Sequence, residues 1–276
     1  MIGLAATAVG VFGSLIGSFL NVVVFRVPAG RSVVSPPSAC GNCGTRIRPL
    51  DNIPVISWVL LRGKCRDCGT SISMRYPFVE LGAGIAFFVV ALVFGVPIAE
   101  ARGSAAAIAA AVVLVAFLYF AAISLSLALI DLDTGRLPNA IVLPAYVVGA
   151  VLLLASAALV GDPAPVLRAV IGAMGLALVY FVIFIAVPRG MGFGDVKLAG
   201  VIGIFLGYLG WEHLVVGAVS AFLLGGLFAV GLLVARKARA KTGVPFGPWM
   251  LAGAWVGILG GPMIAGGYLA LVGGGS

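Results

Sequence analysis

Charged side chains are scarce in this sequence, since Asp, Glu, Lys and Arg together make up 9% of its 276 residues. A soluble globular domain carries about 25% charged residues, so this chain cannot cover a water-facing surface. Histidine occurs once, at His213, and no candidate nucleophile lies beside it, which argues against a histidine-dependent catalytic triad. These two scarcities predict an integral membrane protein whose chemistry does not depend on imidazole.

Long apolar runs occupy most of the chain, and 62% of its residues are hydrophobic. A hydrocarbon core of about 30 Å needs about 20 apolar helical residues. The runs therefore predict an all-α polytopic membrane protein with about eight transmembrane helices. They cover residues 3–25, 78–98, 105–130, 140–160, 166–187, 196–210, 213–234 and 247–272. The sixth run is short, so seven spans are the alternative.

The placement of Lys and Arg predicts the orientation, because positively charged loops stay in the cytoplasm. Eight spans put 15 of the 17 basic residues on one side, whereas seven spans divide them 11 to 6. We therefore predict a first helix over residues 1–25, a cytoplasmic loop over 26–77 and a helical bundle over 78–276, with both termini outside. Nucleic acid could bind the eight basic residues of this loop, but anionic lipid headgroups on the same leaflet are the simpler partner for them, and no nucleic acid is expected. The oligomeric state stays open.

Glycine is abundant, at 40 residues, and two pairs have the GxxxG spacing that lets membrane helices approach closely. The pairs are Gly13 with Gly17 and Gly203 with Gly207. We predict that both pairs make plain helix–helix contacts.

The four cysteines all lie in the hydrophilic loop and form two CxxC pairs separated by 21 residues. Four thiolates so spaced can complete a tetrahedral Zn²⁺ shell, with Gly44 and Gly69 allowing the two tight turns. Such a shell has no open position for water, so we predict a structural zinc site in a zinc-ribbon-like loop. A disulfide pair is the alternative, which a reducing cytoplasm disfavours. The predicted ligands are Cys40, Cys43, Cys65 and Cys68.

Acidic side chains next to membrane spans are costly and therefore suggest function. Asp131 and Asp133 close the third predicted span and Asp195 opens the sixth, so alternating topology brings them to the same cytoplasmic depth. Two carboxylates meeting there would share a proton and could activate water, as in an aspartic protease. Glu80 begins the second span and is either a buried partner of Arg75 or a site residue.

Ordinary structural roles compete with this interpretation. Asp195 could be a helix cap, and Asp131 or Asp133 a turn acid beside Arg136. Gly192 and Gly194 favour the functional interpretation, because glycine would let a substrate backbone approach Asp195. Asp131 and Asp133 lie about 200° apart around a helix, so only one could face a partner, and periodicity does not choose between them.

Several motifs, in order along the chain, resemble those of the bacterial type IV prepilin peptidases. They are residues 17–28 (GSFLNVVVFRVP), the two CxxC pairs, 51–54 (DNIP), 75–80 (RYPFVE), Asp131 with 137–139 (LPN), 192–197 (GFGDVK) and 245–248 (PFGP). The resemblance implies a polytopic aspartic endopeptidase of the GxGD class. Such enzymes remove the basic leader of type IV prepilins and type II secretion pseudopilins at the cytoplasmic face of the bacterial inner membrane.

The resemblance also implies residue roles. The first catalytic aspartate matches Asp131 and the second matches Asp195, while Lys197 completes the second motif. Many members methylate the new N-terminal amine with S-adenosylmethionine, an activity associated with the N-terminal portion that holds the cysteine loop and Glu80. The family often has Asp where this chain has Asn139; since that acid is not catalytic, we expect activity to survive.

Other function classes remain to be weighed. An ion- or proton-coupled transporter could use Asp131, Asp195 and Glu80, but relay acids normally lie near the midplane, whereas these aspartates lie at span ends. A methyltransferase without protease activity is a second alternative, although the sequence has no dinucleotide-binding GxGxxG after a strand. The inner face is itself basic, so recognition of a basic leader must be local, and Asp133 is the candidate for it.

Overall fold

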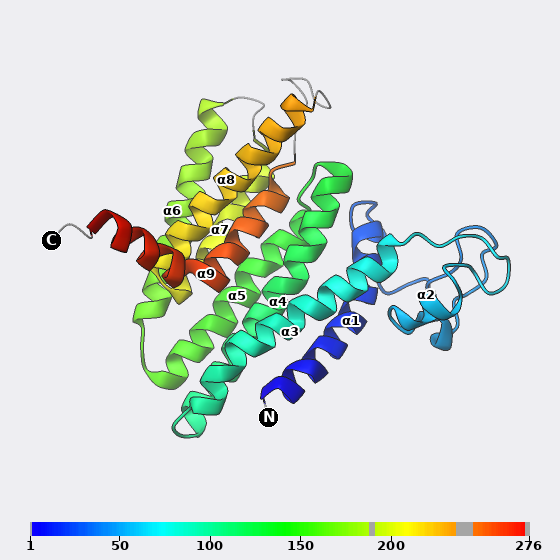
Figure 1. Cartoon of the computed structure of the whole chain (residues 1–276), viewed down its shortest axis with the longest axis horizontal. Helices are drawn as coiled ribbons and strands as arrows, with labels where there is room; N and C mark the ends of the chain where they lie inside the picture. Colours follow the sequence, from blue (N-terminus) through cyan, green and yellow to red (C-terminus); the bar gives the residue numbers. More distant parts are fainter. Residues whose placement is uncertain (1, 188–190, 236–244, 274–276) are drawn as a thin grey trace. The chain divides into compact units, whose positions relative to one another are not determined.

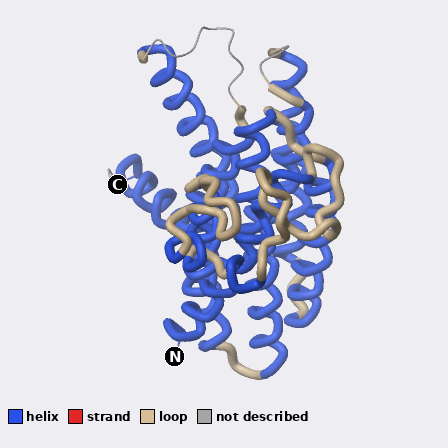
Figure 2. Tube along the Cα trace, turned by 90° about the vertical axis from the view of Figure 1, so that its right-hand side faces the viewer, coloured by secondary structure: helices blue, strands red, loops and turns tan. Residues whose placement is uncertain are grey.

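The computed structural model describes residues 2–187, 191–235 and 245–273, and these residues are predominantly helical. Figure 2 shows helices joined by loops, with no strand among the described residues. Seven of the described helices are long and apolar enough to cross a membrane. The predicted all-α membrane fold is therefore confirmed.

Each of the eight predicted spans is a helix in the structure (Figure 1). The long helices are α1 (Ile2–Arg26), α3 (Arg75–Glu100), α4 (Ser104–Thr134), α5 (Asn139–Val160), α6 (Ala164–Ala186), α7 (Phe193–Leu209), α8 (Trp211–Val234) and α9 (Gly247–Gly273). The loop after α1 adds the short elements η1 (Pro49–Asn52) and α2 (Ile56–Leu60). The predicted sixth span corresponds to α7. This helix has 17 residues, and among the described long helices it is the one that is not among the seven candidate membrane spans.

The third predicted span ends later than its apolar run suggested. The helix α4 continues through Asp131 and Asp133 to Thr134, and Gly135 then adopts a positive φ of 62° and donates its N–H to the Asp131 carbonyl. A left-handed residue after the last helical turn is the usual way for a helix to stop. Both aspartates therefore belong to the last turn of α4 and not to the following loop.

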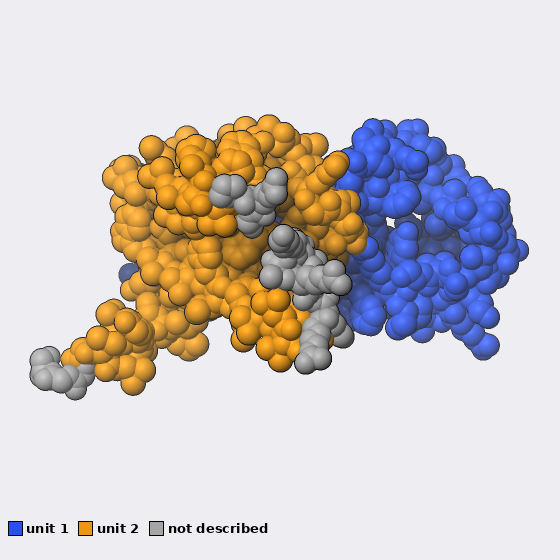
Figure 3. Space-filling model, turned by 90° about the horizontal axis from the view of Figure 1, so that it is seen from above, with its two compact units in different colours: residues 1–126 blue, residues 127–276 orange. Residues whose placement is uncertain are grey.

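The chain forms two compact units, residues 1–126 and 127–276 (Figure 3). In the first unit α1 packs along α3, as Figure 1 shows. A Cβ at Gly13 would lie 2.5 Å from Phe87 Cβ, and one at Gly17 would lie 2.7 Å from Glu80 Cα. Glycine at these positions therefore allows the close contact, which confirms the prediction for the first GxxxG pair.

In the second unit α7 is the central helix, with contacts to α5, α6, α8 and α9. Twelve of its 17 residues are buried, so it is shielded from lipid on most sides. A Cβ at Gly203 would collide with the backbone of Gly172 on α6, and Gly207 lies against the α6 backbone at Arg168 and Ala169. The second GxxxG prediction is confirmed. This packing fixes the first turn of α7, where Asp195 lies.

Candidate active site and metal site

Asp131 is buried at the end of α4, with 4% of its surface exposed, whereas Asp133 is exposed. The Asp131 Oδ2 atom accepts a hydrogen bond of 3.0 Å from the backbone N–H of Gly247, the first residue of α9. Helix N-termini carry unpaired N–H groups and a partial positive charge, which suits a carboxylate. The structure thus distinguishes two aspartates that periodicity alone left equivalent.

Asp195 lies in the first turn of α7 and is 8% exposed. Its Oδ2 atom accepts a hydrogen bond of 3.0 Å from the backbone N–H of Gly192, which precedes the helix. The N-cap is therefore Gly192 and not Asp195, but Asp195, at the third helical position, does contribute to capping by accepting the N–H of the N-cap residue. A carboxylate has two oxygens, however, so capping through Oδ2 is compatible with chemistry at Oδ1.

The surroundings of Asp131 and Asp195 meet at Leu137. A Cβ at Gly194 would lie 3.1 Å from Leu137 Cβ, and one at Gly247 would lie 3.3 Å from Leu137 Cδ2. Gly194 therefore allows Leu137 to pack closely against the start of α7, next to Asp195. Gly192 is exposed, and of the two glycines it is the one open to an approaching chain.

Lys197 joins the starts of α7 and α5. Its Nζ donates a hydrogen bond of 3.0 Å to Asn139 Oδ1, and its carbonyl accepts one of 2.6 Å from the Tyr146 hydroxyl. The ammonium also lies 5.0 Å from the centroid of the Phe193 ring. Asn139, noted in the sequence only as a departure from the family, thus provides an acceptor that holds Lys197 two residues beyond Asp195.

The entry into α9 is fixed by an aromatic cluster that sequence reasoning missed. The Phe246 ring lies 5.5 Å from Phe222 and 6.2 Å from Tyr180, and those two rings lie 5.3 Å apart. Because Phe246 directly precedes Gly247, the cluster positions the amide that reaches Asp131. The sequence signal was the 245–248 motif, in which glycine lies between two prolines near a predicted span.

Glu80, on α3 in the first unit, is 8% exposed. Its Oε2 atom accepts a hydrogen bond of 2.7 Å from the Val55 backbone N–H, and the backbone of α1 at Gly17 packs directly against Glu80. Glu80 therefore links α1, α3 and the loop. The sequence left open whether Glu80 pairs with Arg75 or belongs to a site, and the hydrogen bond that its carboxylate accepts comes from the loop amide of Val55.

The four cysteines converge as the two CxxC pairs predicted. Their sulfurs all lie within 4.8 Å of one another, and Cys40 Sγ lies 3.7 Å from Cys68 Sγ. A tetrahedral metal site with bonds of about 2.3 Å has S···S edges of about 3.8 Å, whereas a disulfide needs about 2.05 Å. The group could therefore hold a metal ion, and the cysteines are not disulfide-bonded.

The two cysteine turns have the same hydrogen-bond pattern. Cys40 N–H bonds to the Thr45 carbonyl at 2.9 Å, and Cys65 N–H bonds to the Thr70 carbonyl at 2.8 Å. Gly44 and Gly69 have positive φ values of 71° and 70°, which glycine adopts without strain. The predicted role of both glycines in the turns is confirmed.

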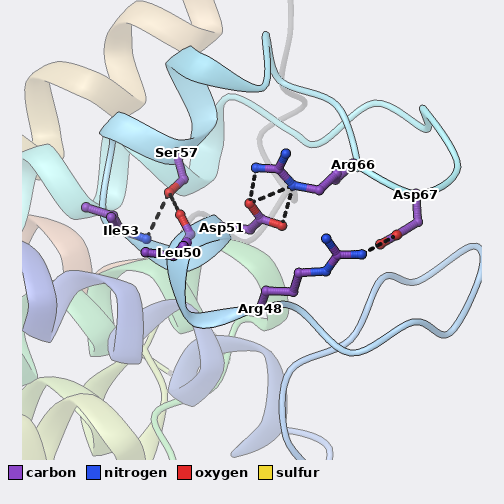
Figure 4. Close-up of polar contacts among 7 residues, drawn as sticks. All are labelled: Arg48, Leu50, Asp51, Ile53, Ser57, Arg66 and Asp67. Carbon is purple, nitrogen blue, oxygen red and sulfur yellow. Dashed lines mark hydrogen bonds and ion pairs between the residues drawn. The ribbon is translucent and has the colours of Figure 1, made fainter.

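Ion pairs tie the second cysteine turn to the rest of the loop (Figure 4). Arg66 Nε donates to Asp51 Oδ2 at 2.9 Å, and Arg48 Nη2 lies 3.1 Å from Asp67 Oδ1. The Arg66 guanidinium holds the pKa of Asp51 below its usual range, so this pair is fully charged at neutral pH. The cysteine group therefore fixes the position of η1 through Arg66.

We predict that purified protein contains about one metal ion per chain and that Cys43→Ser lowers this content strongly, because a tetrahedral site needs all four thiolates. Gly41→Ala is the matched control, since a Cβ there meets nothing within 4 Å, and it should retain the metal. Elemental analysis by mass spectrometry measures the content. Equal metal content in wild type and Cys43→Ser would contradict the prediction.

Comparison with known proteins identifies the family. The family model for the Bacterial Peptidase A24 N-terminal domain matches residues 11–94, and that for the Type IV leader peptidase family matches residues 118–230. The Prepilin leader peptidase/N-methyltransferase of Pseudomonas putida is 35% identical, over 97% of this chain and 94% of that protein.

Proteins of the same name in Aeromonas salmonicida (strain A449) and Pseudomonas aeruginosa are 34% and 33% identical, over 95% of this chain and 92% of each relative. No solved structure is significantly similar to the chain. The order of motifs had already indicated the same family. The extent of the identity, over nearly the full length of both chains, confirms that this integral membrane protein belongs to the type IV leader peptidase family.

Proposed function

We propose that this protein is an aspartic endopeptidase that removes the basic leader of type IV prepilins or type II secretion pseudopilins and then methylates the new N-terminal amine. One observation carries the peptidase assignment. Asp131 and Asp195 are buried carboxylates whose surroundings meet at Leu137, and each has one oxygen held by a glycine N–H at the start of a helix. Both lie in end turns of helices, whereas the acids of a proton or ion relay normally lie near the middle of the membrane.

In the proposed mechanism the two carboxylates share one proton, because like charges in a buried site cannot both ionise cheaply. The ionised member takes a proton from water as the water attacks the scissile carbonyl, which the protonated member polarises. The pair then donates a proton to the leaving amine as the C–N bond breaks. The proton belongs to the pair and is assigned to neither residue.

The two glycine N–H groups orient the pair for this reaction. Because Oδ2 of each aspartate is anchored, the Oδ1 atoms are the ones assigned to water and substrate. Gly192, Gly194 and Lys197 are site-support residues: the first is open to the substrate backbone, and the other two hold the start of α7. Exposed Asp133 supplies a local negative charge for the basic leader.

We place the active site at the cytoplasmic face of the bacterial inner membrane. The positive-inside rule supports this orientation, and part of the evidence lies in basic residues outside the described segments: Arg189, Arg236, Lys237, Arg239 and Lys241. In this orientation residues 26–77 are cytoplasmic, near anionic headgroups. The metal of the cysteine group is then a structural Zn²⁺, because four thiolates in a reducing compartment favour it.

The methyl-transfer half of the proposal rests on the names of the relatives and on the division of the chain. The match to the leader peptidase family begins at residue 118, after the match to the separate N-terminal domain has ended at residue 94. The second activity is therefore assigned to the first unit. S-adenosylmethionine would supply an activated methyl group, and the chain's task is to hold the donor near the new amine.

We predict that Asp131→Asn and Asp195→Asn each lower cleavage of a leader-junction peptide by at least about 100-fold, the usual scale of general acid–base catalysis. Asp162→Asn is the control, because Asp162 is an exposed acid whose Oδ1 accepts the N–H of Ala164, the first residue of α6, and the Asn side-chain oxygen can do the same. The assay uses purified protein in detergent with mass spectrometry of the peptide. Wild-type cleavage by either aspartate variant would refute the peptidase assignment.

We further predict that Gly247→Ala lowers kcat by about 10–100-fold with little change in KM. A Cβ there would lie 2.7 Å from Asp131 Oδ2, and a hydrogen bond to a charged group contributes about 1.5–3 kcal/mol. Gly226→Ala, where a Cβ meets nothing within 4 Å, should keep wild-type kcat. If the two variants had equal kcat, Gly247 would have no role in placing Asp131.

A further inference from the structure

A pocket of about 300 Å³ lies in the first unit, between the second half of α1 and the loop that follows it. Most of the residues that line it are apolar, among them Phe19, Val22 and three prolines, but polar atoms make up much of its surface, with contributions from Ser18, Ser38, Asn52 and the cation of Arg26. Pockets for small ligands have this size and this mixture. The proposed peptidase mechanism, which uses residues of the second unit, leaves this pocket without a role.

The loop wall of the pocket contains a strained turn. Pro54, Val55 and Ile56 form a γ-turn in which Ile56 N–H bonds to the Pro54 carbonyl at 2.5 Å and Val55 has φ 61° and ψ −50°. This classic form is rare, and a β-branched residue with positive φ is an outlier. Such strain persists only where surrounding contacts enforce it, often beside a ligand.

Two sets of contacts enforce the turn. From the membrane side, Glu80 accepts the Val55 N–H and packs against α1 at Gly17, the residue before Ser18 of the pocket. From the loop side, Ser57 Oγ accepts the Ile53 N–H at 3.0 Å and donates to the Leu50 carbonyl at 2.8 Å (Figure 4). Asn52 and Pro54, the pocket residues of this segment, are therefore held in place from both sides.

The cysteine group is connected to the same wall. Arg66 lies between Cys65 and Cys68 and bonds to Asp51, the residue that precedes Asn52 (Figure 4). Metal binding thus fixes Arg66, and Arg66 fixes the segment that carries Asn52. Through this contact, a purely structural metal site helps to hold the wall of the pocket.

The pocket's chemistry suits a ligand that has a flat apolar part, polar groups that can bond to hydroxyl and amide side chains of the pocket, and one carboxylate. Arg26 donates one hydrogen bond to the Ser32 carbonyl at 3.0 Å, and a guanidinium has five N–H donors, so it can also bind a carboxylate. Phe19 and the prolines offer apolar surface to a nucleobase. A nucleoside carrying an amino-acid tail combines these features.

We propose that this pocket binds S-adenosylmethionine, with Arg26 facing the donor's carboxylate, Asn52 and Ser38 its polar groups, and Glu80 acting as a positioning residue behind the wall. The inference rests on the proposed function, because methyl transfer requires a donor site. In the transfer the neutral amine of the new N-terminus forms an N–CH₃ bond, the donor's S–CH₃ bond breaks with its electron pair staying on sulfur, and the nitrogen then loses a proton to solvent.

The test measures binding without turnover. Titration calorimetry of S-adenosylhomocysteine, the donor's product, is performed on full-length metal-loaded protein in nonionic detergent, where anionic headgroups do not compete. Arg26→Gln and Asn52→Ala should each raise Kd by about 10-fold or more, since each removes a polar partner. Arg31→Gln is the control, because Arg31 lies on the same loop, against the Phe25 ring and outside the pocket. It should bind as wild type.

A pair of variants tests the positioning role of Glu80. Glu80→Gln keeps an oxygen acceptor for the Val55 N–H and should bind near the wild-type Kd, whereas Glu80→Ala should bind about 10-fold more weakly. Metal content and thermal unfolding of each variant establish that it is folded. Equal Kd values for Glu80→Gln and Glu80→Ala would overturn this role.

Two failures are distinguishable. Wild-type protein that methylates the cleaved peptide while Arg26→Gln and Asn52→Ala bind the product as tightly as wild type would overturn the pocket assignment and leave the proposed function intact. Wild-type protein that cleaves the peptide but neither binds the product nor methylates would overturn the methyl-transfer half of the proposed function, and the pocket assignment with it.

Discussion

The site depends on one repeated interaction, a backbone N–H at the start of a helix held against a buried aspartate. Gly247 performs this role for Asp131 and Gly192 for Asp195. In a low-dielectric setting such a donor stabilises negative charge without added volume or conformational freedom. The interaction determines which carboxylate oxygens are anchored, and at Gly247 it also favours glycine, because a Cβ there would lie 2.7 Å from Asp131 Oδ2.

The rest of the second unit keeps these two helix starts in register. The central helix α7 contacts four others, and the close approach to α6 through Gly172 and Gly203 leaves little freedom for its axis. The aromatic contacts of Phe246 restrain the entry to α9 in the same way. Because hydrophobic burial does not drive helix association within lipid, close packing and hydrogen bonds must provide this precision.

Much of the architecture could be predicted from the sequence, because apolar run length sets helix position and CxxC spacing sets metal-binding geometry. What could not be predicted depends on contacts between residues far apart in the chain. Gly247 lies 116 residues from its partner Asp131, and nothing local signals the pairing. Periodicity likewise could not choose between Asp131 and Asp133; the resemblance pointed to Asp131, and the structure shows that it is Asp131 that is buried against α9. The sequence left two roles open for Glu80, and it did not predict that the carboxylate would reach the loop amide of Val55.

The central claim is that Asp131 and Asp195 work as one unit that carries one proton in its active form. The most direct test is the pH dependence of kcat/KM for cleavage of a leader-junction peptide. The account predicts a bell-shaped profile: activity falls at low pH as both carboxyls become protonated, and falls at higher pH as both become ionised. A profile that rises with pH to a plateau and does not decline would contradict a shared proton.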